Sequence, residues 1–588
     1  MANRIARLLP FLRWLRPSAI DSSRLRDDLM AGIAVSLLAI PQSLAYAQLA
    51  GVPPHYGLYA AFIPSIVAVL FGSSGIVSTG PVALTSLLTA ASVGQLAPAG
   101  STQFVAYVTL LALLSGIFQL GLGLARAGVL VNLLSHPVLM GFVNAAALLI
   151  AMSQLPAITG IALQQASPAS GQGPGSAFLL DVWSLLQRLD ALNPVALGLG
   201  ALALAMLYCF KRFAPRIPGV LLTVATLTIL SYAIGFEANG GRVVGNIPAG
   251  LPGFSLPDAE WAEWRTIVTL LPAAFVIALI SFMEVMASAK VIALKTRTRW
   301  DENQELIGQG LAKIVAGFCQ SMPVSGSFSR SALNLSAGAK TGFSALFAAA
   351  FVLITLLFLT PVFHHLPLPA LAAMIIMAVV NLLDFGAMRR AWLANRDDGI
   401  AAVLTFAATL VFAPNIQNGI LTGVLFSLGA FIFRRMTPRI SVTRLSAEES
   451  EDNPVDPLPN DNGVCVLRFD AALFFGNVSF FEDALLKLEE DNPGLHTIVI
   501  DARGINNIDA SAVEMLRSLV MRLRENGITL RFAGAKPQVI EVASQTGLLA
   551  EIGQKNIVTG DITGDYGDTS TTRRRPARAP PRRVRSGN

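Results

Sequence analysis

Charged residues are scarce in this chain of 588 residues. They make up 14% of it, against about 25% in a typical soluble domain, while hydrophobic residues make up 53%. The scarcity is uneven, because residues 30–435 contain one long apolar run after another and the residues after 440 do not. This spacing excludes a large soluble enzyme with one buried core. It predicts an α-helical multi-pass membrane domain followed by a soluble domain.

Cysteine and histidine are also few. Cys209, Cys319 and Cys465 are far apart in sequence and have neither metal-ligand spacing nor a disulfide framework. The five histidines form no ligand cluster in the sequence, and the adjacent pair His364 and His365 is interpreted as part of a solvated loop. Because no nucleophile–base pair stands out either, we expect no enzyme activity, no metal and no cofactor.

The apolar runs predict about fourteen membrane spans, since each run is near the roughly 20 residues that cross a bilayer core. Cationic residues precede the first span and follow the fourth, sixth, eighth, twelfth and last. All of these loops then lie on one side of the membrane, so both termini are expected to be cytoplasmic. The expected spans are 29–50, 54–71, 80–95, 103–125, 128–154, 179–211, 217–235, 267–290, 303–320, 328–338, 342–361, 367–385, 398–413 and 416–434.

The third and tenth spans are unusually short. "GSSGIVSTGPVALTSLL" (72–88) and "PVSGSFSRSALNLSAG" (323–338) each open with an extended Ser/Thr/Gly stretch before a short helical run. They occupy corresponding places, third in each set of seven. Paired interrupted segments of this kind indicate an inverted-repeat transporter and its binding site.

The first interrupted segment predicts a half-helix that begins inside the membrane. We expect it to start at Gly80 and Pro81, since proline suits the first helical turn, with Ser78 or Thr79 as its cap. The exposed backbone N–H groups of such a start, together with the helix dipole, favour a bound anion.

The second interrupted segment carries an arginine, which is costly at mid-bilayer. Ser327 or Ser329 is expected to cap this half-helix, and Arg330 adds a full positive charge beside its start. We interpret the break as an anion site. The alternative is a structural Arg330 that pairs with a carboxylate or with carbonyl groups.

A loose repeat relates the first span of each half, "AIPQSLAYAQLA" (39–50) and "ISFMEVMASAKVIA" (280–293). It sets Gln42 opposite Glu284 and Tyr46 opposite Ser288. Intramembrane acids often mark ion or proton pathways, so Glu284 with Ser288 is expected to bind H⁺ or Na⁺, or else to neutralise Arg330. Gln42 and Tyr46 share a helix face and could offer donors to an oxyanion, with interhelical hydrogen bonding as the alternative.

Several motifs together resemble the SulP sulfate permease family. They are "IPQSLAYAQLAGVPPHYGLYAAFIPS", "STGPVALTS", "ENQELIGQGLAKIVAGF" and "PVSGSFSRSALNLSAGAKTG", and the resemblance covers nearly all of 20–560. It implies a seven-plus-seven inverted repeat in which a core domain moves against a gate domain. It also implies an anion site between spans three and ten, with ion coupling by Glu284 and Ser288. The substrate-binding residues that it implies are Gln42, Tyr46, Thr79, Gly80, Pro81, Val82, Phe328, Ser329 and Arg330.

The residues after 440 alternate strand-like and helix-like stretches, which predicts a small α/β domain. This domain resembles STAS domains, in which a loop carries an Asp followed by a phosphorylatable residue. Here Ala510 stands in that acceptor position and Ser511 follows it, which puts phosphoregulation there in doubt. We interpret the domain as a dimerisation and regulatory module. The expected boundaries are 1–28 for a cytoplasmic N-terminal segment, 29–436 for the transporter domain, 446–463 for a linker or loop, 440–560 for the STAS domain and 561–588 for a disordered Arg/Pro-rich tail.

The resulting hypothesis is a secondary active transporter of inorganic anions in a cell membrane, or the inner membrane of a Gram-negative bacterium. Sulfate with H⁺ comes first, and Na⁺-coupled bicarbonate or H⁺-coupled dicarboxylate transport is the alternative. A second alternative is a non-transporting anion sensor that signals through the STAS domain. Expected partners are the anion, H⁺ or Na⁺, membrane lipids and a second copy in a homodimer, without nucleic acid.

Overall fold

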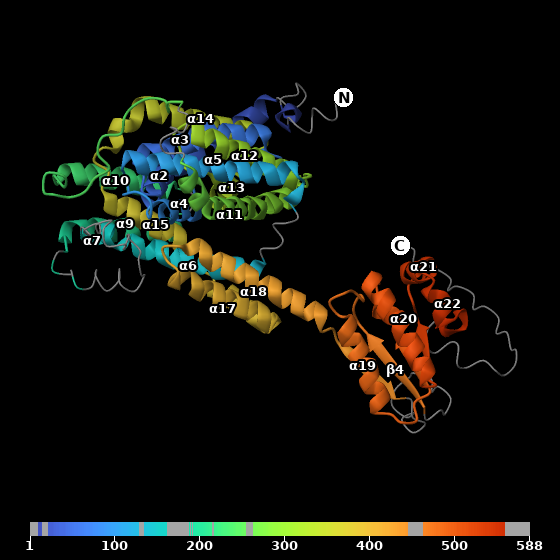
Figure 1. Ribbon diagram of the computed structural model, residues 1–588. Coiled ribbons are helices and arrows are strands. Elements are labelled where there is room, and N and C mark those ends of the chain that lie inside the picture. Colours follow the sequence, from blue (N-terminus) through green and yellow to red (C-terminus); the bar gives the residue numbers. More distant parts are fainter. Residues whose placement is uncertain are drawn as a thin grey trace, which may run out of the picture. The chain divides into compact units, whose positions relative to one another are not determined.

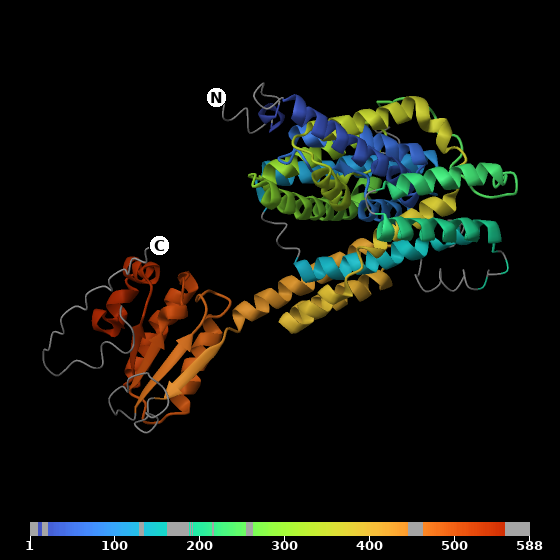
Figure 2. The ribbon, with the colours of Figure 1, turned by 180° about the vertical axis from the view of Figure 1, so that it is seen from behind.

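The computed structural model describes residues 10–14, 21–128, 135–161, 187, 190, 192–214, 217–254, 263–444 and 463–558. The chain divides into two compact units between Ser427 and Leu428, a helical one and one that contains a β-sheet (Figures 1 and 2). Several expected segments lie wholly or partly outside the described residues. They are the tail 561–588, most of the linker 446–463, residues 1–9 and 15–20 of the N-terminal segment, residues 129–134 of the fifth expected span, and residues 179–186, 188–189 and 191 of the sixth.

The chain up to Met436 contains one described helix for each of the fourteen expected spans, in the same order, and the unit boundary falls within the last of them. Nine described helical segments are long and apolar enough to cross a membrane, and the remaining spans are shorter or broken. The corresponding helices are α2 (Ser22–Leu49), α3 (Pro54–Phe71), α4 (Ala83–Val93), α5 (Thr102–Leu124), α6 (His136–Ser153), α9 (Pro194–Phe213), α10 (Gly219–Ala233), α11 (Trp264–Thr296), α12 (Glu302–Phe318), α13 (Phe328–Ser336), α14 (Phe343–Ile354), α15 (Leu368–Val380), α17 (Arg396–Val411) and α18 (Ile416–Met436).

A few short elements were not expected from the apolar pattern. Three of them follow the ends of α6 and α14, one precedes α2 in the chain, and α16 lies between α15 and α17. These elements are η1 (Pro10–Arg13), α7 (Leu155–Thr159), η6 (Thr355–Leu359), η7 (Thr360–Phe363) and α16 (Phe385–Ala394).

The third and tenth spans are broken by extended backbone, as their composition predicted. Strand β1 (Thr79–Gly80) pairs with β2 (Ser325–Gly326) in an antiparallel register that sets Thr79 opposite Gly326. Helices α4 and α13 begin shortly after these strands. The two halves of the helical unit therefore meet through their interrupted segments.

The expected start of the first half-helix at Gly80 and Pro81 is wrong. Helix α4 begins at Ala83, and its N-cap Val82 has extended backbone and supplies no side-chain cap. The reason is the pairing of β1 with β2, which keeps this stretch extended past the proline. The expected cap of the second half-helix is confirmed for Ser327, whose hydroxyl accepts a hydrogen bond from the Arg330 N–H at 3.4 Å.

The helices pack as two groups. The core group comprises α2, α3, α4, α5, α11, α12, α13 and α14, and the gate group comprises α6, α7, α9, α10, α15, α16 and α17 (Figure 1). Contacts of α2 with α10 and α15, and of α4 with α6, join the two groups. This division gives the core and gate arrangement, with both half-helices in the core group.

Small residues let core helices approach closely. A side chain added at Gly310 of α12 would lie 2.6 Å from the backbone nitrogen of Leu120 on α5, and one at Gly116 of α5 would lie 2.8 Å from the Gly310 carbonyl oxygen. Close helix contact through glycine is typical of membrane helix pairs. It brings α5 and α12 of the core group into close contact.

The second unit is a five-stranded sheet with helices, as the alternating pattern predicted. Its strand order is β3-β4-β5-β6-β7, with β3 antiparallel to β4 and the other pairs parallel. All five residues of β5 are buried, which fits a central strand covered on both faces. Strands β3 and β7 and helix α22 were not expected. The elements are β3 (Ile440–Arg444), β4 (Val464–Phe469), α19 (Val478–Glu490), β5 (Thr497–Asp501), η8 (Ala502–Gly504), α20 (Ala510–Glu525), β6 (Thr529–Ala533), α21 (Pro537–Gln545), α22 (Leu548–Ile552), η9 (Gln554–Asn556) and β7 (Ile557–Val558).

Candidate anion-binding site

Hydrogen bonds connect the two interrupted segments where β1 pairs with β2, a place that we call the half-helix junction. The Ser327 N–H donates to the Ser78 carbonyl at 2.8 Å, and the Ser78 N–H donates to the Ser331 hydroxyl oxygen at 2.9 Å. The Ser65 hydroxyl of α3 donates to the Thr79 carbonyl at 2.8 Å. These bonds satisfy backbone groups that would otherwise be costly to bury. The junction can therefore keep irregular backbone inside an apolar domain.

Two helix N-termini follow directly from this junction. Helix α4 starts after Val82 and α13 starts after Ser327. The first N–H groups of a helix have no partner within the helix and carry a partial positive charge. Since β1 and β2 are paired, both N-termini are held close together. The arrangement suits an oxyanion placed between them.

Arg330 lies in the first turn of α13 and is buried. Its Nη1 donates to the Pro81 carbonyl at 3.0 Å, so the guanidinium reaches across to the other interrupted segment. A side chain at Gly80 would come within 3.0 Å of Nη2, so glycine leaves room for the guanidinium. Among the described residues, Nε and Nη2 have no hydrogen-bond partner.

The alternative of a structural Arg330 accounts for only part of this geometry. One nitrogen bonds a carbonyl, as that alternative requires. In the part of the chain that the structure describes, however, Arg330 and Glu284 form no ion pair, and two donor groups of the guanidinium remain for a ligand. An arginine fork with free donors is well suited to an oxyanion.

Helix α2 adds the two expected polar residues. It packs against both α4 and α13. The Tyr46 side chain is buried and interacts electrostatically with Arg330 and with Glu284. Gln42 is half-buried, and its side-chain oxygen has no partner among the described residues. Tyr46 thus belongs to the same cluster as the arginine, and Gln42 lies one helical turn before it on the same face.

The remaining expected substrate residues differ in exposure. Thr79, Gly80, Pro81 and Val82 are buried at the junction. The Phe328 side chain is 56% exposed, and Ser329 is exposed with its hydroxyl 3.3 Å from that of Ser327.

Glu284 of α11 contacts the junction through β2. The Ser325 hydroxyl lies 2.7 Å from a carboxylate oxygen of Glu284 and 3.1 Å from the Ser281 carbonyl, and its one hydrogen can be donated to either acceptor. Ser288, the expected partner in ion coupling, instead donates its hydroxyl to the main-chain carbonyl of Glu284 at 3.0 Å. The structure therefore connects the carboxylate to the junction but not to the Ser288 hydroxyl.

Sequence reasoning missed a second buried cation. Lys313 of α12 is fully buried and donates to the side-chain oxygen of Gln119 and to the Ser281 hydroxyl. It also interacts electrostatically with Glu284. The arginine is therefore not the sole positive charge near this region. The available signal was a lysine within the apolar stretch "GLAKIVAGF".

Glu305 and Gln309, also on α12, were missed as well. Both are buried, and a Glu305 carboxylate oxygen accepts the backbone N–H groups of Ser73 and Ser74 at 2.9 and 3.0 Å. The Gln309 amide donates to the Thr79 hydroxyl at 2.9 Å and to the other Glu305 oxygen at 3.2 Å. These contacts fix the segment that leads into β1, so they position Thr79.

In the sheet unit, the loop that matches the antagonist phosphorylation site serves as a helix cap. A carboxylate oxygen of Asp509 accepts the Ala512 N–H at 2.9 Å, and the other accepts the Phe475 N–H at 2.8 Å. Ala510 and Ser511 are exposed at the start of α20. The acceptor position itself carries no hydroxyl.

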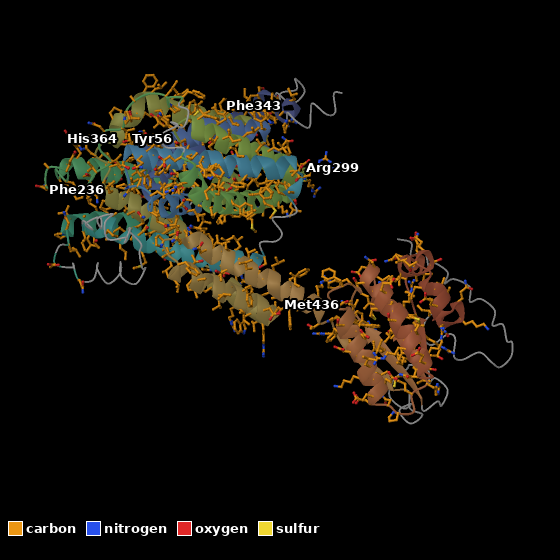
Figure 3. The ribbon with its side chains drawn as sticks, in the orientation of Figure 1. Tyr56, Phe236, Arg299, Phe343, His364 and Met436 are labelled. Carbon is orange, nitrogen blue, oxygen red and sulfur yellow. The ribbon has the colours of Figure 1, made fainter. Side chains whose placement is uncertain are left out.

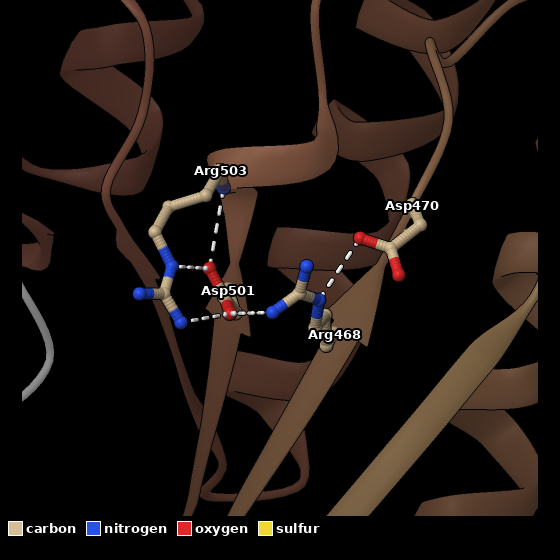
Figure 4. Close-up of polar contacts among 4 residues, drawn as sticks. All are labelled: Arg468, Asp470, Asp501 and Arg503. Atoms are coloured by element: carbon tan, nitrogen blue, oxygen red, sulfur yellow. Dashed lines mark hydrogen bonds and ion pairs between the residues drawn. The ribbon is translucent and has the colours of Figure 1, made fainter.

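A charged cluster lies at the carboxyl end of β5. Asp501 is buried, and Arg503 approaches it with a 2.7 Å ion pair, while Arg468 lies 3.9 Å away and also pairs with Asp470 (Figure 4). Burial acts to raise the pKa of Asp501, but the hydrogen bonds and charge of Arg503 and the charge of Arg468 outweigh it and hold the pKa below its ordinary value of 3.8.

The expectation that the histidines form no ligand cluster needs correction. Glu237, His364 and His365 come together in the helical unit with potential ligand atoms within 4.8 Å of one another. The histidines are adjacent in sequence but the glutamate comes from a distant loop, so sequence spacing could not reveal the group.

Comparison with known proteins matches both units. The model of the sulfate permease family matches residues 25–405, and the model of the STAS domain matches residues 457–559. A relative from Arabidopsis thaliana named sulfate transporter 4.1, chloroplastic, is 33% identical over 93% of this chain and 80% of its own length. A relative from Mycobacterium tuberculosis named a probable sulfate transporter is 32% identical over 91% of this chain and 93% of its own length.

The fold matches a solved structure as well. The murine solute carrier 26 family member A9 anion transporter, in its inward-facing state, superposes with a TM-score of 0.85. The match covers 96% of this chain and 94% of that one, at 23% sequence identity. It supports the same fold for both units.

Proposed function

Since this chain belongs to the sulfate permease family and ends in a STAS domain, we propose that it is a secondary active transporter that carries sulfate together with H⁺. Anion transport in a multi-pass membrane domain follows from the family. The choice of sulfate draws on the names of two relatives, a chloroplastic sulfate transporter and a probable mycobacterial one.

The observation that carries the proposal is the partly free guanidinium of Arg330 at the meeting point of two half-helices. Its Nε and Nη2 have no protein partner among the described residues, and the N-termini of α4 and α13 begin beside it. A sulfate dianion offers four oxygen acceptors, so it can satisfy both the guanidinium and helix N–H groups. The proposed substrate contacts are those of the guanidinium and the two N-termini, with Tyr46 and Gln42 on α2.

Proton coupling would act through Glu284. Its carboxylate accepts the Ser325 hydroxyl, and Ser325 pairs with Gly80 across the β1–β2 junction. A charged carboxylate near the site would repel an incoming dianion, because like charges in a low-dielectric environment interact strongly. Protonation removes this repulsion, so sulfate and H⁺ would favour each other's binding. Ser288 enters this proposal only through its bond to the Glu284 main chain.

The orientation and assembly are part of the same proposal. Cationic loops follow spans four, six, eight, twelve and fourteen, which favours cytoplasmic termini in a cell membrane. We assign 29–436 to the transporter domain and 440–560 to the STAS domain, with the latter as the regulatory and dimerisation module of a homodimer. We assign no catalytic activity.

Uptake into proteoliposomes tests the function. Purified protein is reconstituted, and uptake of radiolabelled sulfate, bicarbonate and a dicarboxylate is measured while H⁺ and Na⁺ gradients are varied separately. We expect acid-driven accumulation of sulfate that does not depend on Na⁺. Na⁺-driven bicarbonate uptake would contradict both the substrate and the coupling ion, and saturable anion binding without any uptake would identify an anion sensor.

A further inference from the structure

We propose that Glu237, His364 and His365 form a binding site for a divalent transition-metal ion, with Zn²⁺ as the best-fitting one, on the helical unit. The site is separate from the residues of the half-helix junction. His364 and Phe236, the neighbour of Glu237, lie at one end of the helical unit, and Arg299 lies at the other (Figure 3).

Two of the three pairs of ligand atoms already have the spacing of a metal site. The Oε2 atom of Glu237 lies 3.3 Å from Nε2 of His364 and 3.3 Å from Nδ1 of His365. Bonds of about 2.0–2.2 Å to a tetrahedral zinc ion place neighbouring ligand atoms about 3.3–3.6 Å apart. These two distances match this edge length, the two histidine nitrogens lie within 4.8 Å of each other, and the group would leave a fourth position for water.

The protonation pattern of His364 also favours an ion. Its Nδ1 lies 2.9 Å from the side-chain oxygen of Asn246, and this oxygen can only accept, so Nδ1 carries the hydrogen. In the neutral ring, Nε2 then carries a lone pair that is available to a metal ion. An outer-shell partner that fixes the tautomer of a histidine ligand is typical of metal sites.

Both rings approach a single oxygen of Glu237, and the ring centroids of His364 and His365 are 4.6 Å apart. One divalent ion satisfies all three groups at once, and two imidazoles with one carboxylate favour zinc-like metals over Mg²⁺ or Ca²⁺.

The loops that carry the ligands are held together before any metal binds. The Gly245 N–H donates to the His364 carbonyl at 3.0 Å, and the Val244 N–H donates to the Leu366 carbonyl at 2.9 Å. Val243 and Pro367 form an antiparallel bridge. All three ligands are only partly buried, so a hydrated ion can reach them from solvent. The site is therefore preorganised and accessible.

A bound ion would link the core and gate groups. Glu237 follows α10 of the gate group, and His364 follows η7 at the end of the run that begins with α14 of the core group. Backbone hydrogen bonds already join the two loops, and one ion would add a link between their side chains. Binding to the folded state alone also raises thermal stability with increasing ion concentration.

Zinc binding to the full-length protein in detergent tests the proposal, with any histidine tag removed. Isothermal titration calorimetry with Zn²⁺, and the visible absorption of Co²⁺ as a replacement ion, give stoichiometry and ligand geometry. We expect one site per chain with tetrahedral Co²⁺ bands, both lost in Glu237→Gln and in the double variant His364→Asn/His365→Asn. Asn246→Ala should weaken binding about tenfold or more through the outer shell.

The matched control is His136→Asn, which removes an exposed histidine at the start of α6 outside this group. It should bind zinc like the wild type. The same variants are heated with and without Zn²⁺, and the ion should raise the unfolding temperature of the wild type and of the control only. Absence of a wild-type site at micromolar zinc would overturn the proposal, and so would zinc binding by the double variant equal to that of the wild type.

Discussion

Replacement of Arg330 by alanine should weaken sulfate binding strongly while leaving the fold in place. The side chain is buried and makes one protein hydrogen bond, to the Pro81 carbonyl at 3.0 Å. Its other donors, on Nε and Nη2, lack protein partners among the described residues. We assign these two donors to the anion.

The size of the effect follows from those donors. A hydrogen bond that involves a charged group contributes about 1.5–3 kcal/mol, so two of them contribute about 3–6 kcal/mol to anion binding. Since each 1.4 kcal/mol corresponds to a tenfold change in affinity, the variant should bind sulfate about 10²–10⁴-fold more weakly. Arg330→Lys keeps the charge but not the planar guanidinium group, so its affinity for sulfate should fall between those of the wild type and of Arg330→Ala.

The assay is sulfate titration by calorimetry in detergent, followed by initial uptake rates in proteoliposomes. Lys290→Gln is the charge-matched control, because Lys290 is exposed on α11 and pairs with Glu302 at 3.5 Å. It removes the same charge from the helical unit and should leave affinity unchanged. A folded, monodisperse Arg330→Ala protein with wild-type sulfate affinity would refute the assignment of Nε and Nη2 to the anion.

Three further predictions follow from the other contacts. Glu284→Gln, which mimics the protonated acid, should abolish acid-driven accumulation of sulfate but leave passive exchange; an unchanged pH profile of uptake would reduce Glu284 to a structural residue. Deletion of 440–588 should lower yield, dimerisation or turnover but spare sulfate affinity, because every proposed substrate contact lies before residue 331; loss of binding in a folded truncation would contradict this. The depressed pKa of Asp501 means that its pairing with Arg503 stabilises the second unit fully above the ordinary pKa of 3.8, and this stabilisation is lost as the pH falls through the lower pKa of the folded state. Calorimetry of the full chain should therefore show that Asp501→Asn lowers the unfolding temperature more at pH 6 than at pH 3, and an equal difference at both would contradict the charge pairing.

The fold was largely predictable because membrane spans and buried strands leave direct marks in composition. Span 54–71 coincides with α3, and span 416–434 with most of α18. The alternating stretches after residue 440 likewise predicted the α/β unit that contains β5. Short elements such as β7 (Ile557–Val558) were not predicted, because two residues are too few to show the alternation of apolar and polar side chains that marks a strand.

The half-helix start shows where local rules failed. Pro81 and the preceding hydroxyl residues satisfy the local rules for a helix beginning, yet α4 begins at Ala83. Pairing of β1 with β2, which lies far along the chain, keeps the backbone extended there. The local sequence does not reveal that a strand from the other half of the protein, β2, pairs with this stretch.

The site was predictable where a polar residue broke an apolar stretch and not where partners came from afar. Arg330 and Glu284 stood out because their neighbours are apolar or small. Lys313 is equally buried, but its role depends on Gln119 and Ser281, which lie on two other helices. Nothing in the sequence around Glu237 indicated a metal site, since its histidine partners come from a different loop.

The location of a bound anion tests the central claim most directly. Selenate is a close analogue of sulfate, and its selenium atom is located by anomalous scattering from crystals of the wild-type protein grown at saturating selenate. We expect a selenium peak between the N-termini of α4 and α13, with selenate oxygens within hydrogen-bond distance of Nε and Nη2 of Arg330. A bound selenate elsewhere in the helical unit, with this junction empty under saturating conditions, would contradict it.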